Sequence, residues 1–291
     1  MRKEGNGVVV SRASTYDNLS NLAKNFRDQV LRFEGTQIGR QEVYGELLDL
    51  AESGLLKKSW FKLYPAFKSN GEPNPLPYFE TILISLDTAM TANTHSDNTA
   101  CTVWGVFKHT NEKNKQVTCA LLLDCWAERL TYPDLRDRAK QAWLCYYGTA
   151  NNGKGQQPST ILIEDKGSGI SLRQDLQSEM IPVAAFNPGR ADKVQRANLA
   201  APILKDGFIW LPESEKRPGE FKNWIDEFMD EITIFPASDA HDDQVDSFIQ
   251  AMHYLYSANY LHAPLDAAQE VDEVEVDYDR KRRNVLNPYA Q

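Results

Sequence analysis

The stretch FETILISLDTA, residues 79–89, decides how the rest of the chain is interpreted. Its apolar run over residues 82–86, interrupted by one serine, is typical of a central β-strand that is covered on both faces. The run ends on Asp87, and an acidic group at the end of a buried strand is costly unless something pairs with it. A metal ion is one such partner, and a capping role in the following loop is the other interpretation. The choice depends on whether other segments bring further acids to the same place.

Composition limits the class of protein. The chain has 291 residues, of which 42% are hydrophobic, so it can form one large or two modest domains with a substantial core. It has no apolar run near the ~20 residues of a membrane span and no signal-peptide core, so we expect a soluble, cytoplasmic protein without a membrane partner. The four cysteines lack CxxC spacing, which favours reduced thiols over disulfides or a zinc site. The net charge of −9 argues against a simple nucleic-acid coat, although a local basic groove is compatible with it.

Changes in composition divide the chain into three parts. The Pro- and Gly-rich stretch over residues 68–77 marks a linker. Seven acids lie between residues 266 and 279 without a Lys or Arg, and RKRR follows at residues 280–283, so this end of the chain is expected to be a solvated, mobile arm. The predicted parts are an N-terminal segment 1–78 with a strand at 8–10 and helical spacing over 19–33 and 40–53, a main domain 79–260, and a tail 261–291.

The hydrophobic periodicity predicts the order of elements in the main domain. Three strands over residues 80–87, 99–107 and 116–126 are joined by turns as an antiparallel meander. The elements that follow are helices over 135–147, 171–178, 193–204, 221–232 and 242–256 and strands over 161–165, 182–186 and 208–211. This α/β order predicts a mixed sheet, a three-strand meander plus parallel strands, flanked by helices. It is the arrangement of RNase H-like folds.

Two more elements carry acids at their ends. The strand over residues 161–165 ends on Glu164 and Asp165, and the glycines after it allow a tight turn. The last helix begins with three acids, namely Asp242, Asp243 and Asp246. An N-cap and a favourable helix dipole would also explain these three, but residues three apart share one face of a helix that packs on the sheet. Carboxylates from two strand ends and one helix start can hold two Mg²⁺ or Mn²⁺ ions, the arrangement used for in-line phosphoryl displacement.

Four short motifs, taken in order, resemble the nuclease domain of tailed-phage terminase large subunits. They are ISLDTA at 84–89, DNTA at 97–100, IEDKGSG at 163–169 and HDDQVD at 241–246. The resemblance covers about residues 80–258, and residues 8–46 resemble the stretch that joins the terminase motor to its nuclease. It implies an RNase H-like endonuclease that cuts concatemeric viral DNA during genome packaging in the host cytoplasm, by two-metal-ion hydrolysis of phosphodiester bonds.

The resemblance also implies site residues and partners. Asp87 is the first metal ligand, Asp165 is favoured over Glu164 as the second, and the third is Asp243. Its neighbours Asp242 and Asp246 are alternates. The implied cofactors are two Mg²⁺ or Mn²⁺ ions. The implied partners are double-stranded DNA, the terminase small subunit, the portal protein and a motor ATPase in the same or a companion chain.

Basic residues near the predicted site are candidates for DNA binding. Arg190, Lys193 and Arg196 lie three apart at a helix start, where backbone amides and cations suit DNA phosphates. Lys166, beside the second acidic pair, is a weaker candidate. A solvated helix face is the alternative explanation for the first three.

The sequence departs from a complete terminase large subunit in one respect. The segment GTANNGKG at 148–155 matches the spacing of a phosphate-binding loop, but it ends on glycine where a Ser or Thr should hold Mg²⁺, and it follows a helix rather than a strand. ATP turnover is therefore not expected of this segment. Two other functions remain as alternatives: an RNase H-like nuclease of the resolvase or integrase type, and a non-catalytic packaging module that docks the portal.

Overall fold

The computed structural model describes residues 2–4, 8–10, 33, 36, 54–88, 98–112, 114–148, 155–189, 191–236 and 242–261. Except for residues 33 and 261, the helices predicted over 19–33 and 40–53 and the tail 261–291 lie outside this part of the chain. Arg190 lies outside it as well. At the N-terminus, β1 (Arg2–Glu4) and β2 (Val8–Val10) form an antiparallel two-stranded sheet.

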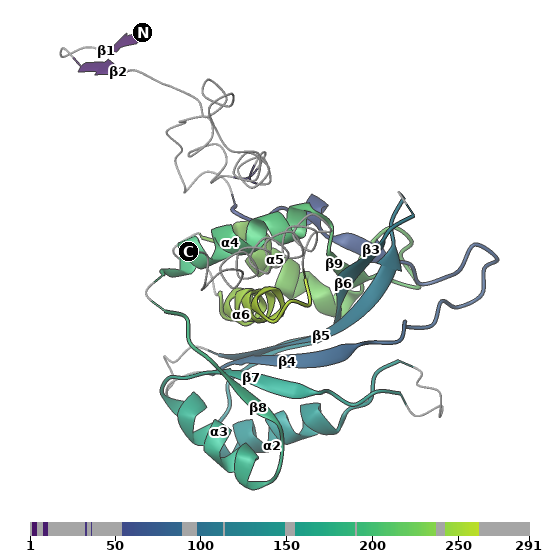
Figure 1. The fold of residues 1–291 in the computed structure, drawn as a ribbon, viewed down its shortest axis with the longest axis vertical. Helices are drawn as coiled ribbons and strands as arrows, with labels where there is room; N and C mark the ends of the chain where they lie inside the picture. The colour runs from purple at the N-terminus through teal and green to yellow at the C-terminus, as the bar shows by residue number, and fades with distance from the viewer. Residues whose placement is uncertain are drawn as a thin grey trace, which may run out of the picture.

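A seven-stranded mixed sheet forms the centre of the domain (Figure 1). Its strands, in spatial order, are β3 (Lys62–Tyr64), β9 (Ile209–Pro212), β6 (Gln116–Glu128), β5 (Thr99–Thr110), β4 (Thr81–Asp87), β7 (Thr160–Glu164) and β8 (Val183–Phe186). Strands β4, β5 and β6 pair antiparallel as a meander. Strands β7 and β8 continue from β4 in parallel pairing. The predicted α/β fold, an RNase H-like mixed sheet flanked by helices, is confirmed.

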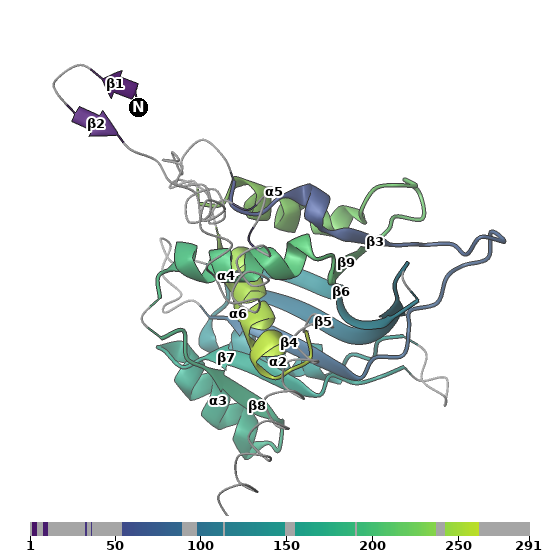
Figure 2. The same cartoon turned by 45° about the horizontal axis from the view of Figure 1, so that its top comes forward.

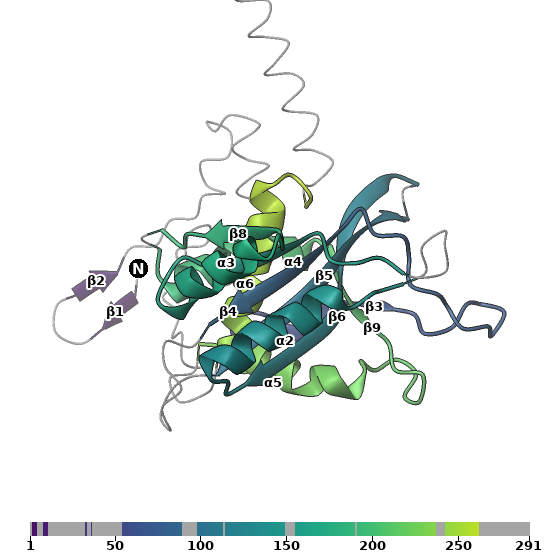
Figure 3. The ribbon, with the colours of Figure 1, turned by 90° about the horizontal axis from the view of Figure 1, so that it is seen from below.

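Helices cover both faces of the sheet. The helices are α2 (Tyr132–Leu144), α3 (Ser168–Ser178), α4 (Lys193–Lys205), α5 (Asp226–Ile234) and α6 (Asp243–Ser257), with short 3-10 turns η3 (Lys58–Trp60) and η4 (Asn223–Ile225). Figure 1 shows α4, α5 and α6 on one face and α2 and α3 on the other, and Figure 3 shows α2 and α3 from their own side. Helix α6 packs directly on β4 and β5, with α4 and α5 against it (Figure 2).

Strand β4 is buried because it lies in the interior of the sheet beneath α6. Residues 82–86 are all buried, as their apolar run predicts. On the α6 side, the ring of Trp104 packs against those of Phe248 and Phe228, with centroids 5.6 and 6.4 Å away. Aromatic burial of this kind makes a large contribution to the core. The core thus packs α6 against β4 and β5, so the two elements that carry the first and last predicted acids, β4 and α6, are in direct contact.

The sheet also takes in residues that precede position 79. Strand β3 pairs in parallel with β9, and Leu55, Leu56 and Phe61 are buried in the core. Residues 62–64 (KLY) lack the continuous apolar run by which residues 8–10 (VVV) are predicted as a strand, so β3 was not predicted. The division of the chain into 1–78, 79–260 and 261–291 stays a prediction.

Two predictions from composition can be compared with the described residues. Cys101, Cys119 and Cys125 are buried, Cys145 is exposed, and all four are free thiols. None of the helices in the described ranges is both long enough and apolar enough to cross a bilayer.

Candidate active site

Strands β4 and β7 bring two acids to the same edge of the sheet. They are parallel neighbours, and Leu86 lies opposite Ile163 in their register. Asp87 and Glu164 each follow by one residue, so the two side chains leave the sheet beside each other. The carboxyl ends of neighbouring parallel strands are a usual place for functional side chains in α/β folds.

The start of α6 is capped by a residue of α5. The side chain of Asp242, the N-cap residue, makes no capping hydrogen bond. Instead the carboxylate of Glu231 accepts hydrogen bonds from the backbone N–H of Gln244, at 2.9 Å, and from its side-chain amide, at 3.0 Å. Burial raises the pKa of Glu231, and the hydrogen bonds from Gln244 oppose that rise. The first turn of α6, which carries Asp243 and Asp246, is thereby tied to α5.

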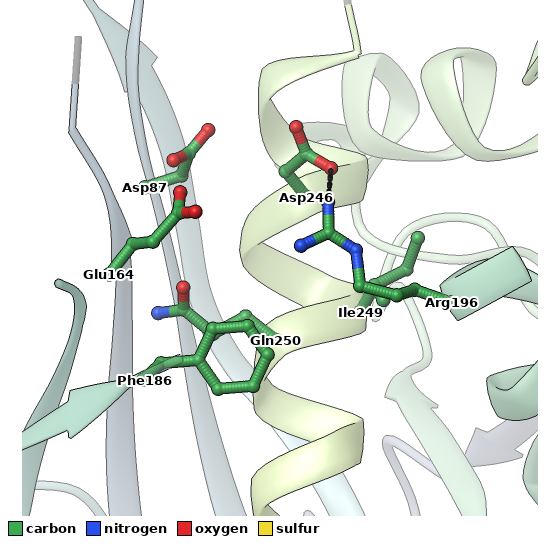
Figure 4. A pocket seen from close by; sticks show the side chains of 7 residues that line it. All are labelled: Asp87, Glu164, Phe186, Arg196, Asp246, Ile249 and Gln250. Atoms are coloured by element: carbon green, nitrogen blue, oxygen red, sulfur yellow. Dashed lines mark ion pairs between the residues drawn. The ribbon is translucent and has the colours of Figure 1, made fainter. Parts of the chain in front are cut away.

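A pocket lies where β4, β7 and α6 meet (Figure 4). Its lining residues are Asp87, Glu164, Phe186, Arg196, Asp246, Ile249 and Gln250. Asp87 comes from β4, Glu164 from β7 and Asp246 from α6, and Figure 4 shows their carboxylates gathered around one opening. Three of the six predicted acids therefore line the same pocket.

The pocket concentrates negative charge that its own cations balance incompletely. The pKa of Asp87 is raised to about 8, chiefly by burial and further by repulsion from Asp246 and Glu164, while Lys193 opposes the rise. Burial also raises the pKa of Asp246, against the influence of Lys193. The Oδ1 atom of Asp246 is buried and accepts no hydrogen bond from any described residue; Nη2 of Arg196 lies 3.9 Å from it. A buried, unbonded carboxylate oxygen in an acidic pocket fits a bound cation.

The donor set suits a hard divalent cation, because Mg²⁺ and Mn²⁺ prefer carboxylate oxygen. As the side chains stand, no group of three or more His, Cys, Asp or Glu residues in the described part of the chain forms a ready metal-ligand cluster. The three acids thus match the chemistry of the predicted metal but do not make a closed ligand shell. Metal ligation stays a prediction for each of them.

The other predicted acids make different contacts. Asp165 is 42% exposed and forms an ion pair with Nη2 of Arg173 at 2.8 Å. Asp243 is buried, and its Oδ2 accepts hydrogen bonds from the backbone and side-chain amides of Asn98 at 3.3 and 3.2 Å. Asp242 pairs with Lys193 at 2.7 Å. The pocket is lined by Glu164 and Asp246, the alternates, whereas Asp165 and Asp243, the first choices, do not line it.

Three of the predicted DNA-binding cations are paired with acids of the site. Nζ of Lys193 lies 2.7 Å from Asp242 and 2.6 Å from Asp246. Burial lowers the pKa of Lys193, but the carboxylates of Asp246 and Asp242 outweigh burial and raise it. Arg196 lines the pocket, and Lys166 pairs with Glu164 at 2.7 Å. DNA contact by these residues and by Arg190 stays a prediction.

Sequence reasoning missed a row of buried polar side chains on α6. Gln244, Ser247 and Gln250 lie three residues apart and are each at most 4% exposed. Each makes a hydrogen bond to a neighbouring element. A signal was present, since polar residues at helical spacing lie within an otherwise apolar helix, but the pattern alone cannot tell a buried polar row from a solvated one.

Comparison with known proteins assigns the chain to a class and then to a family. The sheet order and the flanking helices define an RNase H-like domain. The family model described as the terminase RNaseH-like domain matches residues 84–255, more than half of the chain. The chain belongs to this family. No curated protein matches it in sequence.

Solved structures of large terminases from thermophilic phages resemble the chain. The large terminase of one thermophilic bacteriophage, in crystal form 2, is 13% identical to this chain and superimposes with a TM-score of 0.55. The match covers 84% of this chain and 54% of that terminase. A second crystal form of the same terminase gives 15% identity, a TM-score of 0.53, and coverage of 84% and 55%. The large terminase nuclease from thermophilic phage G20c, solved with bound magnesium, is 15% identical with a TM-score of 0.42 and coverage of 70% and 98%. The chain thus spans about half the length of the first of these terminases, with which it shares its fold.

Proposed function

We propose that this chain is a metal-dependent DNA endonuclease of the terminase type. The observation that carries the proposal is the convergence of Asp87, Glu164 and Asp246 in one pocket of a terminase RNaseH-like domain. Acids from two parallel strand ends and one helix start supply carboxylate oxygens suited to divalent cations that hydrolyse phosphodiester bonds.

The three pocket acids are the proposed ligands for Mg²⁺ or Mn²⁺, and two ions are proposed to bind. When bound, the metal activates a water for attack on phosphorus and stabilises the leaving 3′ oxygen. Asp246 offers the buried Oδ1 that makes no hydrogen bond to a described residue. Asp87 has a pKa raised to about 8 by burial and neighbouring acids, so it gains most from a cation nearby. Lys193 and Arg196 hold Asp246 in place while the phosphate approaches.

The proposed substrate is concatemeric double-stranded viral DNA, cut during genome packaging in the host cytoplasm. The proposed partners are those of the family's packaging machinery: the terminase small subunit, the portal protein and a motor ATPase in the same or a companion chain. Portal binding by chains with and without residues 262–291 tests whether the acidic and basic tail is the docking element.

A plasmid-nicking assay tests the nuclease. We expect the wild-type protein to cut plasmid DNA with Mg²⁺ or Mn²⁺ and not with EDTA, and Asp87→Ala to abolish cutting. Asp137→Ala is a suitable control, because Asp137 lies on the exposed side of α2. A wild-type protein that cuts no DNA with either metal would leave the non-catalytic packaging module as the better function. A strong preference for four-way junctions over linear duplex would instead favour the resolvase type.

A further inference from the structure

We infer that Gln250 is a positioning residue that fixes where Asp246 lies relative to Asp87 and Glu164. The inference concerns the geometry of the pocket, and it rests on the proposed function only where it predicts metal affinity. Gln250 is 4% exposed and lines the pocket, although it is neutral and no acid-based prediction includes it.

The side-chain amide of Gln250 joins α6 to both acid-bearing strands. Its Nε2 donates toward Oγ of Ser85, the carbonyl oxygen of Leu86 and the carbonyl oxygen of Leu162, each at 3.2 Å. Two N–H groups are shared among these three acceptors. Leu86 directly precedes Asp87, and Leu162 lies two residues before Glu164. One buried group thus bonds to β4 and β7 just before the residues that enter the pocket.

A shift of α6 would move Gln250 and Asp246 together, because they are four residues apart on this helix. That spacing places them on the same face, about one helical turn apart. A rotation or slide of α6 that moved Asp246 would therefore also break the bonds of Gln250. In Figure 4 the amide nitrogen of Gln250 faces the strands, while its oxygen points to the side where Asp87 and Glu164 gather.

A second polar contact one turn earlier fixes the helix in the same way. Oγ of Ser85 donates to the backbone carbonyl of Ser247 at 2.8 Å, and Oγ of Ser247 donates to the carbonyl of Ser85 at 2.9 Å. Apolar contacts are not directional, so they would allow α6 to settle in several neighbouring positions. Hydrogen bonds to strand atoms allow fewer positions of α6, even though each bond adds only about 1 kcal/mol of net stability. The buried polar row therefore specifies position more than it adds stability.

The chain offers a matched control at the opposite end of β4. Gln156 is a second glutamine, whose side-chain amide bonds to the backbone just before β4: Nε2 donates to the carbonyl of Phe79, and Oε1 accepts from the N–H of Phe79, both at 2.7 Å. Gln156 does not line the pocket. Replacing Gln156 also removes hydrogen bonds between a glutamine side chain and backbone, but it leaves the pocket residues unchanged.

The test compares Gln250→Leu with Gln156→Leu in the full chain. We expect both variants to fold with lowered melting temperatures. Titration calorimetry with Mn²⁺ should show affinity for Gln250→Leu reduced by about 10- to 100-fold, the usual effect of losing a residue that orients metal ligands, and near-wild-type affinity for Gln156→Leu. Metal-free crystal structures should show Asp246 displaced from Asp87 only in Gln250→Leu.

Several outcomes would overturn the inference. Wild-type metal affinity and an unmoved Asp246 in Gln250→Leu would do so, as would equal losses of affinity in both variants. If Gln250→Leu does not fold, Gln250→Met takes its place, and failure of both to fold would make Gln250 a stability residue instead. If the wild-type protein binds no Mn²⁺ but Asp246 still moves in Gln250→Leu, the proposed function fails and the positioning role stands.

Discussion

Asp87 sets the pH response of the metal-free pocket. Its folded-state pKa is raised to about 8, above the ordinary value of 3.8, because burial and the nearby Asp246 and Glu164 disfavour its charge. A carboxyl group with a raised pKa stabilises the fold when protonated and destabilises it as pH rises toward the folded pKa. The free energy of unfolding in EDTA should therefore fall between pH 5 and pH 8, by up to roughly 1.4 kcal/mol per pH unit from this group.

Replacing Asp87 by asparagine isolates this effect. We expect Asp87→Asn to be more stable than the wild type at pH 8, with a smaller advantage at pH 5, in urea unfolding followed by circular dichroism. Asp137→Asn, which removes an exposed acid, should track the wild type at both pH values. Parallel profiles for Asp87→Asn and the wild type would show that the pKa of Asp87 is not raised in the folded protein.

Glu164 and Asp165 are neighbours in sequence with opposite expected roles. Glu164 lines the pocket, whereas Asp165 is paired with Arg173. We expect Glu164→Gln to lose metal-dependent cutting by about 100-fold or more, a loss comparable with removing one group that stabilises developing charge in a transition state. Asp165→Asn should stay within about tenfold of the wild-type rate. Single-turnover cleavage of a labelled duplex measures both, and the reverse ranking would restore Asp165 as the ligand.

The sequence predicted that acids of β4, β7 and α6 lie close together, but not which of those acids line the pocket. An apolar run followed by an acid can be found by pattern, so Asp87 was singled out. Side chains at successive positions of an extended segment point to opposite sides, so the choice between Glu164 and Asp165 depends on where the strand ends. The register of β4 and β7 supplies this information, and a single sequence does not contain it.

At the scale of elements, α3 approaches the end of β7 unusually closely. A Cβ atom built at Gly169, in the first turn of α3, would lie 2.3 Å from the carbonyl oxygen of Glu164. Glycine therefore lets the helix backbone rest against the residue that enters the pocket. Ser168 adds a hydrogen bond from its Oγ to Oγ1 of Thr88, at 3.1 Å, next to Asp87.

Gly169→Ala tests whether this approach matters. By helix propensity alone alanine would stabilise α3 by up to about 1 kcal/mol. The clash with Glu164 reverses the sign, and we expect a loss of roughly 1–3 kcal/mol in urea unfolding together with weaker Mn²⁺ binding. Ser171→Ala, at an exposed position of the same helix, is the control and should be neutral or slightly stabilising. A stabilised Gly169→Ala variant would show that α3 can move away without cost.

Short strands such as β2 and β9 were predicted as well as the long elements, whereas β3 and the 3-10 turns were not. Helix α6 and the meander strands agree with their predicted ranges to within a few residues. The helix predicted over 221–232 is instead the 3-10 turn η4 followed by α5. The difference arises because an apolar stripe indicates which face is buried but does not separate a 3-10 turn from the α-helix that it leads into.

At the scale of the whole molecule, the distribution of charge determines the DNA binding that we expect of the proposed nuclease. The net charge is −9, and Lys166, Lys193 and Arg196 are paired with acids of the site. DNA binding in EDTA should therefore be weak, independent of sequence, and steeply weakened between about 50 and 200 mM salt. Fluorescence anisotropy with two unrelated duplexes measures this. A flat salt response, or a clear preference for one duplex, would point to base contacts instead of phosphate contacts.

The pocket draws on residues about 80 positions apart in the sequence, at 87, 164 and 246. Because α6 supplies the last of them, a chain emerging from the ribosome cannot assemble the pocket until nearly the whole domain has been synthesised. The contacts that close it are among the most non-local in the fold, which places them late in folding. A growing or truncated chain therefore lacks the complete pocket, and under the proposed function it would not cut nearby DNA.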